Sequence, residues 1–277
     1  MFNFVANIFG YLLNFIYNLV NNYGVAIILF TLFVKVILIP ISIKQQKTMK
    51  KSSELQVELR AIQEKYKNDQ ERANKEMMAL YKQNNMSPFS GCLSSIIQII
   101  LLLSVFYLVS RPLTYMKKVD LELIDKYKDE LSLKSNYPEV RIIREKGSED
   151  DRVYLNMNFL GLDLSNVPSY NYKDFKVFVI PILYVISSII SMKMTLNMQD
   201  KKKIKENNEK ENETNPMPDM SKSMSYMMPI MAVSISLVAP LGLALYWLVN
   251  NVLMITERII LDKFILNKED GKENEAK

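Results

Sequence analysis

Residues 23–43, YGVAIILFTLFVKVILIPISI, are the stretch that decides the fold, because they form an apolar run interrupted by one cation, Lys35. A helix of this length crosses a hydrocarbon core of roughly 30 Å. Lys35 lies past the middle of the run, where a cation costs at least roughly 2.5–3.5 kcal/mol on insertion scales. The run therefore predicts a membrane-spanning helix that carries one unusual charge.

Similar apolar runs recur along the chain and are separated by strongly charged segments, so the mean hydropathy of −0.01 averages two unlike populations. Together they predict an all-α membrane protein with five transmembrane helices. The last apolar stretch is too long for one span, and Pro240 and Gly242 break it into two. The spans are expected at residues 23–43, 91–111, 175–194, 223–239 and 241–261.

The segment before the first span is expected to be an amphipathic helix on the membrane surface. Residues 1–22 place apolar side chains at steps of three and four, with asparagines between them. A partly buried packing helix is the alternative, since the polar stripe has no basic residue. The apolar positions are Phe4, Ile8, Tyr11, Leu12, Phe15 and Leu19.

Residues 44–90 are expected to form a cytoplasmic antiparallel helical hairpin that turns at Lys67-Asn68-Asp69. Residues 112–174 read as an extracellular loop with a helix-like piece at 120–134 and a strand-like piece at 139–144. The Lys/Glu/Asn-rich residues 195–222 are expected to be a mobile cytoplasmic connector, and residues 262–277 a cytoplasmic tail.

Orientation follows from the basic residues that flank the spans. No Lys or Arg precedes Lys35, whereas lysines follow the first and third spans closely. We therefore expect a multi-pass protein of the bacterial cytoplasmic membrane with its N-terminus outside and its C-terminus in the cytoplasm. The N-terminal residues do not match a secretory signal, so the mature chain is expected to start near Met1.

Lys35 is the residue most indicative of function. No predicted span has an Asp or Glu in its interior, and Glu257 is placed at the inner end of the fifth. Lys35 is therefore expected to meet water, carbonyls or neutral dipoles in a hydrated cavity; snorkelling toward the headgroups is the alternative. The polar residues that could line this cavity are Thr31, Gln98, Ser104, Ser187, Ser188, Ser191, Ser234, Ser236, Asn250 and Asn251.

These candidates are unequal, because serine in a membrane helix more often permits close helix packing than lines a pore. Gln98 and the Asn250-Asn251 pair cost more to bury. The chain has no histidine and one cysteine, Cys92, so we expect no metal site, no cofactor and no covalent catalysis. A solute or ion transporter and a membrane scaffold remain alternatives, although a proton-coupled transporter usually needs intramembrane carboxylates.

In order along the chain, several blocks resemble the YidC/Oxa/Alb membrane insertases, and among them the bacterial YidC proteins of the Gram-positive type. The blocks are Tyr23-Gly24 with Leu38-Ile39-Pro40, Lys50 with Leu55-Gln56, Glu64 to Asp69, Glu76-Met77-Met78 with Leu80-Tyr81-Lys82, Gly91-Cys92-Leu93 with Gln98, Phe159 to Leu164, and Pro240 to Trp247 followed by Asn250-Asn251.

The resemblance implies five core helices around a hydrophilic groove that opens to the cytoplasm and to lipid. It implies an insertase and chaperone whose clients are nascent membrane proteins, with the ribosome, the signal recognition particle pathway, the Sec translocon and anionic lipids as partners and no specific nucleic acid. It implies Lys35 as the groove cation, and the groove residues predicted with it are Thr31, Gln98, Ser188, Tyr246, Trp247, Asn250 and Asn251.

This chain departs from the family pattern at the groove cation. Most bacterial members look as if they carry arginine at this position. Lys35 keeps the charge but lacks the planar fork that grips a carboxylate through two donors. Ser94 stands where a proline often follows the Gly-Cys-Leu block, and the lipoprotein-type signal common in Gram-positive relatives is absent. Electrostatic attraction of an acidic client tail is nevertheless expected.

Overall fold

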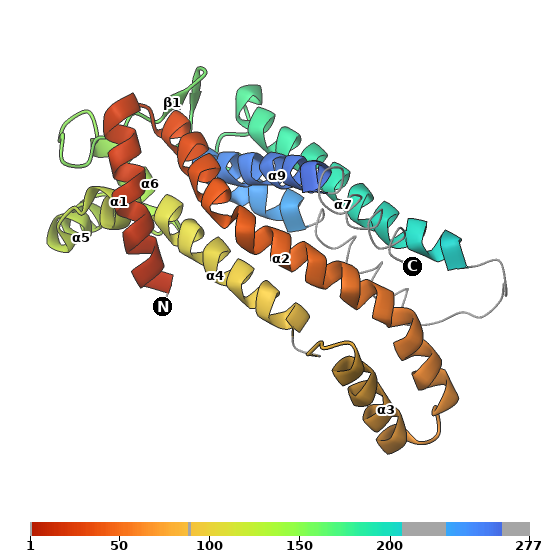
Figure 1. The fold of residues 1–277 in the computed structure, drawn as a ribbon. Coiled ribbons are helices and arrows are strands. Elements are labelled where there is room, and N and C mark those ends of the chain that lie inside the picture. Colours follow the sequence, from red (N-terminus) through yellow and green to blue (C-terminus); the bar gives the residue numbers. More distant parts are fainter. Residues whose placement is uncertain (1, 88–89, 207–230, 262–277) are drawn as a thin grey trace. The chain divides into compact units, whose positions relative to one another are not determined.

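The computed structural model describes residues 2–87, 90–206 and 231–261 of the chain, and this part is mostly helical. It divides into two compact units: Met1–Lys35 with Leu103–Ile259, and Val36–Leu102 with Ile260–Lys277. Helices α2 (Tyr23–Lys65) and α4 (Ser90–Ser110) contribute to both units. Figure 1 shows the order of the elements along the chain.

Four helical segments of the described chain are long and apolar enough to cross a membrane. They lie at Asn3–Val20 in α1 (Phe2–Val20), Tyr23–Thr48 in α2, Phe175–Met194 and Leu241–Leu261. Large apolar side chains such as Phe33, Ile37 and Ile186 stay about half exposed along them, which is typical of surfaces that face lipid. The structure thus describes an all-α protein of the membrane type.

Two of the predicted spans are described only in part. Within the second predicted span, α4 contains a shorter apolar helix, Ile99–Ser110, and the side chains of 90–98 lie outside the described set. In the fourth, residues 231–238 are helical, and residues 223–230 lie outside the described residues. Most of the predicted connector and the whole predicted tail, residues 207–222 and 262–277, lie outside them as well.

The ends of several helices differ from the sequence prediction. Helix α2 continues without a break through Pro40 and beyond the predicted end of the first span at 43, as far as Lys65. Helix α7 (Val179–Glu206) likewise extends twelve residues beyond the predicted end of the third span at 194. Proline removes one backbone hydrogen bond, which a long helix tolerates when the residues on both sides favour helix.

The predicted turn after the first long helix is confirmed. Helix α3 (Gln70–Gln83) begins after Asp69, whose side chain accepts a hydrogen bond from the Arg72 amide at 3.0 Å. This cap satisfies one of the free N–H groups at the start of the helix. The Gln63 amide nitrogen of α2 donates to the Met77 sulfur of α3 at 3.5 Å, so the two helices meet after the turn.

The loop between α4 and α7 is a folded region. It contains a π-helix, η1 (Leu113–Lys117), α5 (Leu121–Glu130), α6 (Pro138–Lys146), a short antiparallel hairpin of β1 (Asn158–Phe159) and β2 (Leu162–Asp163), and a 3-10 helix, η2 (Phe175–Phe178). The helix expected within 120–134 is confirmed as α5.

The strand-like prediction at 139–144 is wrong, because these residues belong to α6. Pro138 occupies the first turn, where its missing N–H has no cost. Glu139 follows in the first turn and Lys146 lies in the last, so both charges suit the helix dipole. Val140 and Ile143 share the buried face, which fits a period of 3.6 better than one of 2.

Helix α1 packs against the start of this folded loop. A Cβ atom at Gly10 would overlap the carbonyl oxygen of Tyr115 in η1, so only glycine permits this approach. The Tyr115 hydroxyl donates to the Asn3 side chain at 3.0 Å, and the Asn156 amide donates to the Tyr17 hydroxyl at 2.8 Å. Both ends of α1 are therefore held by residues 113–156.

The same loop also holds the starts of two long helices, α2 and α9 (Leu241–Leu261). The Tyr23 amide donates to the Asn156 carbonyl at 2.9 Å, and the Gly242 amide donates to the Leu164 carbonyl at 2.9 Å. At Gly24 an added Cβ would lie 2.5 Å from the Phe159 ring. Since the first N–H groups of a helix lack partners within it, the loop carbonyls complete these ends.

A buried carboxylate fixes η1. Glu139 is 3% exposed and accepts hydrogen bonds from the Thr114 amide at 2.9 Å and the Thr114 hydroxyl at 2.6 Å. Burial raises the pKa of Glu139, and the hydrogen bonds from Thr114 oppose this shift without cancelling it. The carboxyl thus joins α6 to η1 across 25 positions of sequence.

Replacing Glu139 should weaken this region. Glu139→Ala leaves the Thr114 amide unpaired and should cost roughly 1–3 kcal/mol, measured by thermal unfolding of the purified protein in detergent. Because the folded-state pKa of Glu139 is raised, its contribution is largest below its ordinary pKa of 4.5 and is lost as pH rises through the folded value. Acidification toward that value should therefore stabilise the wild type relative to Glu139→Gln.

Glu145→Gln, at an exposed position of the same helix, is the matched control. A pH dependence that is the same in the wild type and Glu139→Gln would show that Glu139 does not titrate differently in the folded protein.

Candidate functional site

Lys35 forms an ion pair with a carboxylate on another long helix. Its Nζ atom lies 3.5 Å from Oε2 of Glu257 in α9, and both residues belong to the same compact unit. The two side chains are 22% and 15% exposed. The expectation that Lys35 has no acidic partner is therefore wrong.

Glu257 reaches Lys35 because its side chain points back along α9. Helical side chains lean toward the N-terminus of their helix, and α9 continues to Leu261 beyond Glu257. The carboxylate is thus displaced from the end of α9 back along the helix. The position of Glu257 in the predicted span indicates where its backbone lies. It does not indicate where the carboxylate at the end of the side chain lies.

The ion pair is incompletely satisfied. A distance of 3.5 Å is longer than the roughly 2.7–2.9 Å of a charge-assisted hydrogen bond. The other carboxylate oxygen of Glu257, Oε1, is buried and has no hydrogen-bond partner in the described part of the chain. The two charges compensate each other electrostatically, but one acceptor remains open.

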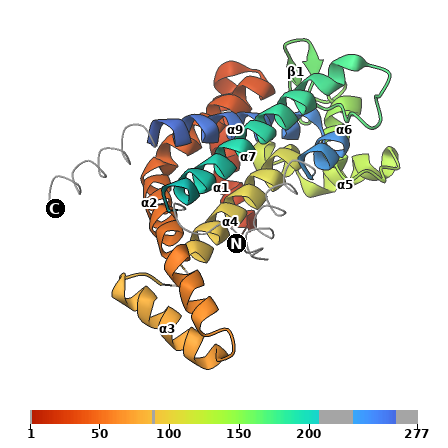
Figure 2. The same cartoon turned by 90° about the vertical axis from the view of Figure 1, so that its right-hand side faces the viewer.

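Helices α7 and α9 lie side by side in both views and are joined by two contacts (Figures 1 and 2). The rings of Tyr184 and Trp247 stack with centroids 5.8 Å apart and an interplanar angle of 29°. The Asn251 side-chain amide donates to the Ser187 hydroxyl at 3.4 Å. Trp247 and Asn251, both predicted site residues, therefore face α7.

Three hydroxyls that the sequence offered as cavity lining bond within their own helices. Thr31, Ser187 and Ser236 are nearly buried. Their hydroxyls donate to carbonyls three or four residues earlier, at 2.6, 2.8 and 3.0 Å. This pattern is typical of small polar residues that let membrane helices approach closely.

The other predicted residues lie on or near the same helices. Tyr246 is buried in the core of its unit, whereas Ser188 and Asn250 are half-buried. Tyr246, Asn250 and Glu257 share one face of α9, because they are separated by four and seven residues. The side chain of Gln98 lies outside the described set.

The structure thus brings Lys35 to Glu257, and Trp247 and Asn251 to α7. Sequence reasoning missed Glu257 as a site residue and Tyr184 as the partner of Trp247. Glu257 carried a usable signal, since it is the one carboxylate within the five predicted spans, and Lys35 is a cation within another of them. Tyr184 carried none.

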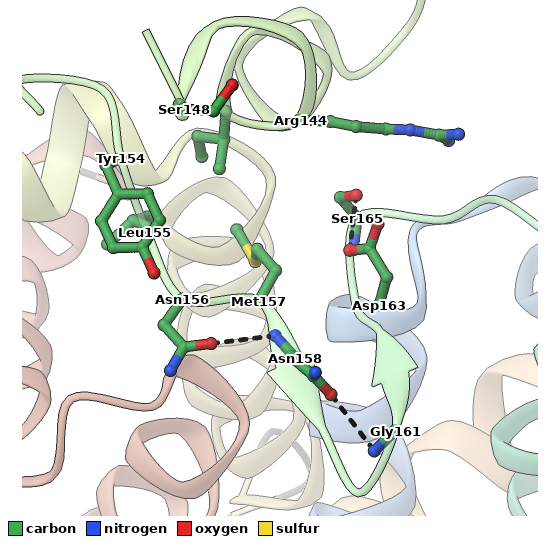
Figure 3. Close-up of a pocket in the computed structure, with 12 residues that line it drawn as sticks. Arg144, Ser148, Tyr154, Leu155, Asn156, Met157, Asn158, Gly161, Asp163 and Ser165 are labelled. Atoms are coloured by element: carbon green, nitrogen blue, oxygen red, sulfur yellow. Dashed lines mark hydrogen bonds between the residues drawn. The ribbon is translucent and has the colours of Figure 1, made fainter. Parts of the chain in front are cut away.

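An open pocket of about 360 Å³ lies in the folded loop, between the end of α6 and residues 154–165 (Figure 3). Its polar side chains mainly fix the hairpin. Asn158 accepts from the Gly161 amide at 3.2 Å, and Asp163 accepts from the Ser165 amide and hydroxyl at 2.9 and 2.7 Å. The Arg144 guanidinium donates to Asn166 at 2.9 Å. These contacts give the pocket a structural explanation.

A double-mutant cycle should measure the coupling of Lys35 and Glu257. Lys35→Met or Glu257→Gln alone removes one charge and leaves the other partly buried, so each should lower the unfolding temperature in detergent. The double variant should lose less than the sum, with a coupling of roughly 1–3 kcal/mol.

The exposed pair Lys75 and Glu71, at 3.3 Å, is the control, and the same exchanges there should show almost no coupling. Equal coupling at the two pairs would mean that Lys35 and Glu257 behave as ordinary surface charges.

Long apolar helices, joined by contacts among their few polar and charged side chains, define a multi-pass helical membrane protein. The chain belongs to the 60Kd inner membrane protein family, whose model matches residues 15–269. Three similar proteins are called "Membrane protein insertase YidC". Those of Geobacter metallireducens and Syntrophobacter fumaroxidans are each 29% identical over 257 residues, and that of Treponema denticola is 27% identical over 259.

These alignments cover 93–94% of this chain but only 36–37% of the relatives. The chain thus spans little more than a third of the length of the curated relatives it matches. The resemblance to the YidC/Oxa/Alb family is confirmed.

Proposed function

We propose that this chain is a membrane protein insertase and chaperone, which integrates and helps to fold proteins in the bacterial cytoplasmic membrane. The observation that carries the proposal is the alignment of 93% of the chain with relatives called membrane protein insertases. The paired charges of Lys35 and Glu257 between apolar helices give this activity a candidate site.

We assign five spans to the chain, at α2, α4, residues 175–194 within η2 and α7, residues 223–239, and α9, with the N-terminus outside. Helix α1 is apolar and long enough to cross, but its contacts favour a surface position. Both Asn3 and Tyr17, fourteen residues apart, bond to the same folded loop. A helix that crossed the bilayer would not keep both ends beside a polar region on one side.

The proposed site is a hydrophilic groove open to the cytoplasm and to lipid. Lys35 supplies its attraction for acidic client tails, and Thr31, Gln98, Ser188, Tyr246, Trp247, Asn250 and Asn251 form its surroundings. Attraction is long-ranged in a site of low dielectric constant. The partly exposed Lys35 ammonium leaves room for a carboxylate to approach.

Insertion of this kind needs no nucleotide. A client's short acidic tail enters the groove, while its adjoining apolar helix slides along lipid-facing surfaces such as Ile182 and Ile186 of α7, which are about half exposed. Burial of about 20 apolar residues supplies the driving force. The groove lowers the barrier for the polar residues that must cross.

Nascent membrane proteins are the proposed substrates. The charged segment 44–90, with ten basic and six acidic residues, is suited to docking partners of the translation and targeting machinery. We propose the ribosome, the signal recognition particle pathway and the Sec translocon as such partners, together with anionic lipids at the cytoplasmic surface.

A depletion-rescue assay tests the role of Lys35. Cells depleted of their own insertase receive this chain, and insertion is scored with two reporters that differ only in an acidic or a neutral external tail. Lys35→Ala should reduce insertion of the acidic-tail reporter roughly tenfold, because it removes the attracting charge, and should affect the neutral reporter little.

Lys126→Ala, at an exposed position of α5, is the matched loss of one lysine and should leave both reporters unchanged. Insertion of the acidic-tail reporter by Lys35→Ala at the wild-type level would remove Lys35 from the mechanism. Failure of the wild-type chain to restore either reporter would contradict the insertase proposal itself.

A further inference from the structure

The contact between Lys35 and Glu257 has a direct consequence for clients. In the described structure the ammonium that attracts an acidic tail already faces a carboxylate, at 3.5 Å. A client carboxylate cannot take the same position without displacing Glu257. A client carboxylate that approaches Lys35 therefore competes with Glu257 for the same positive charge.

The geometry suits such an exchange. The separation exceeds that of a charge-assisted hydrogen bond, and Oε1 of Glu257 is buried without a partner in the described residues. A client carboxylate that approaches Lys35 more closely gains what the resident glutamate lacks. Once displaced, Glu257 requires a donor, and a backbone N–H of the client can donate to either of its carboxylate oxygens.

The pairing of Lys35 with Glu257 also sets how acidic a client tail must be before it binds Lys35. A lysine without a counter-charge would attract any anion that reaches it, whereas Lys35 responds to the difference between the incoming acid and Glu257. A tail with one acidic residue offers a single carboxylate to compete with the single carboxylate of Glu257. A tail with several raises the local concentration of carboxylates beside the same ammonium and competes better.

We propose that Glu257 is a specificity-determining residue that competes with client carboxylates for Lys35 and so sets how acidic an external tail must be for efficient insertion. This inference rests on the insertase function proposed above. It concerns the selection of clients by their charge and not the ability to insert.

The test uses the full-length chain in the depletion-rescue assay, with a reporter series whose tails carry zero, one, two or three aspartates. Insertion by the wild type should rise with the number of aspartates. Glu257→Gln keeps the shape but removes the competing charge. It should improve insertion of the one-aspartate reporter on the order of threefold and leave the neutral reporter unchanged.

Two variants separate competition from loosening of the helices. Asp125→Asn removes an exposed carboxylate of α5 that pairs with Lys128, and this variant should reproduce the wild-type dependence of insertion on tail charge. The double variant Lys35→Met, Glu257→Gln lacks the attracting ammonium and should lose both the gain and the dependence on aspartates.

The outcomes distinguish the two proposals. If the wild type restores insertion and Glu257→Gln shows the same dependence on tail charge, the inference about Glu257 is wrong and the insertase function stands. If the wild type restores nothing, the proposed function fails first. Should Glu257→Gln not accumulate, Glu257→Asp shortens the side chain and should shift the series in the same direction; an unshifted series would overturn the inference.

Discussion

An ionisable group between apolar helices must be compensated, and this constraint links most of the structure. Lys35 lies within the apolar part of α2, and Glu257 of α9 compensates it. Because desolvation of either charge alone is expensive, the two helices are held at a fixed relative depth. Breaking the contact would leave each charge without this ion-pair partner, which makes the ion pair both a structural contact and a place where ligands can act.

The folded loop between α4 and α7 fixes the starts of α2 and α9 so that Lys35 and Glu257 lie at matching depths. Its carbonyls bond to the first amides of α2 and α9, at Tyr23 and at Leu241 and Gly242. Lys35 lies twelve residues after the first of these anchors and Glu257 sixteen after the second. At about 1.5 Å per residue, each charge is therefore fixed about 18–24 Å from the loop. The buried Glu139 and the approach of α1 at Gly10 hold the loop itself together.

Local sequence patterns predicted much of the fold and little of the site. The long apolar helices, the turn before Asp69 and the start of α9 after Pro240 follow from hydropathy and from turn residues near in sequence. The strand-like prediction at 139–144 failed because burial on one helix face gives a short run of β-branched residues that resembles a strand. The pairing of Lys35 with Glu257 joins residues more than 200 positions apart, and no local pattern reports such a contact.

The acidic partner changes how the proposed site discriminates between clients. Attraction to a lone ammonium depends on charge alone and decays with salt, so it would favour anions of every kind. Attraction to a paired ammonium depends on how well the client tail satisfies both Lys35 and Glu257 compared with the ion pair itself. This includes a donor for Oε1 of Glu257. Lysine suits this exchange better than arginine, since its compact charge is not gripped through two parallel bonds by the resident carboxylate. Lysine at position 35 and its long contact to Glu257 therefore both favour easy replacement of the internal partner.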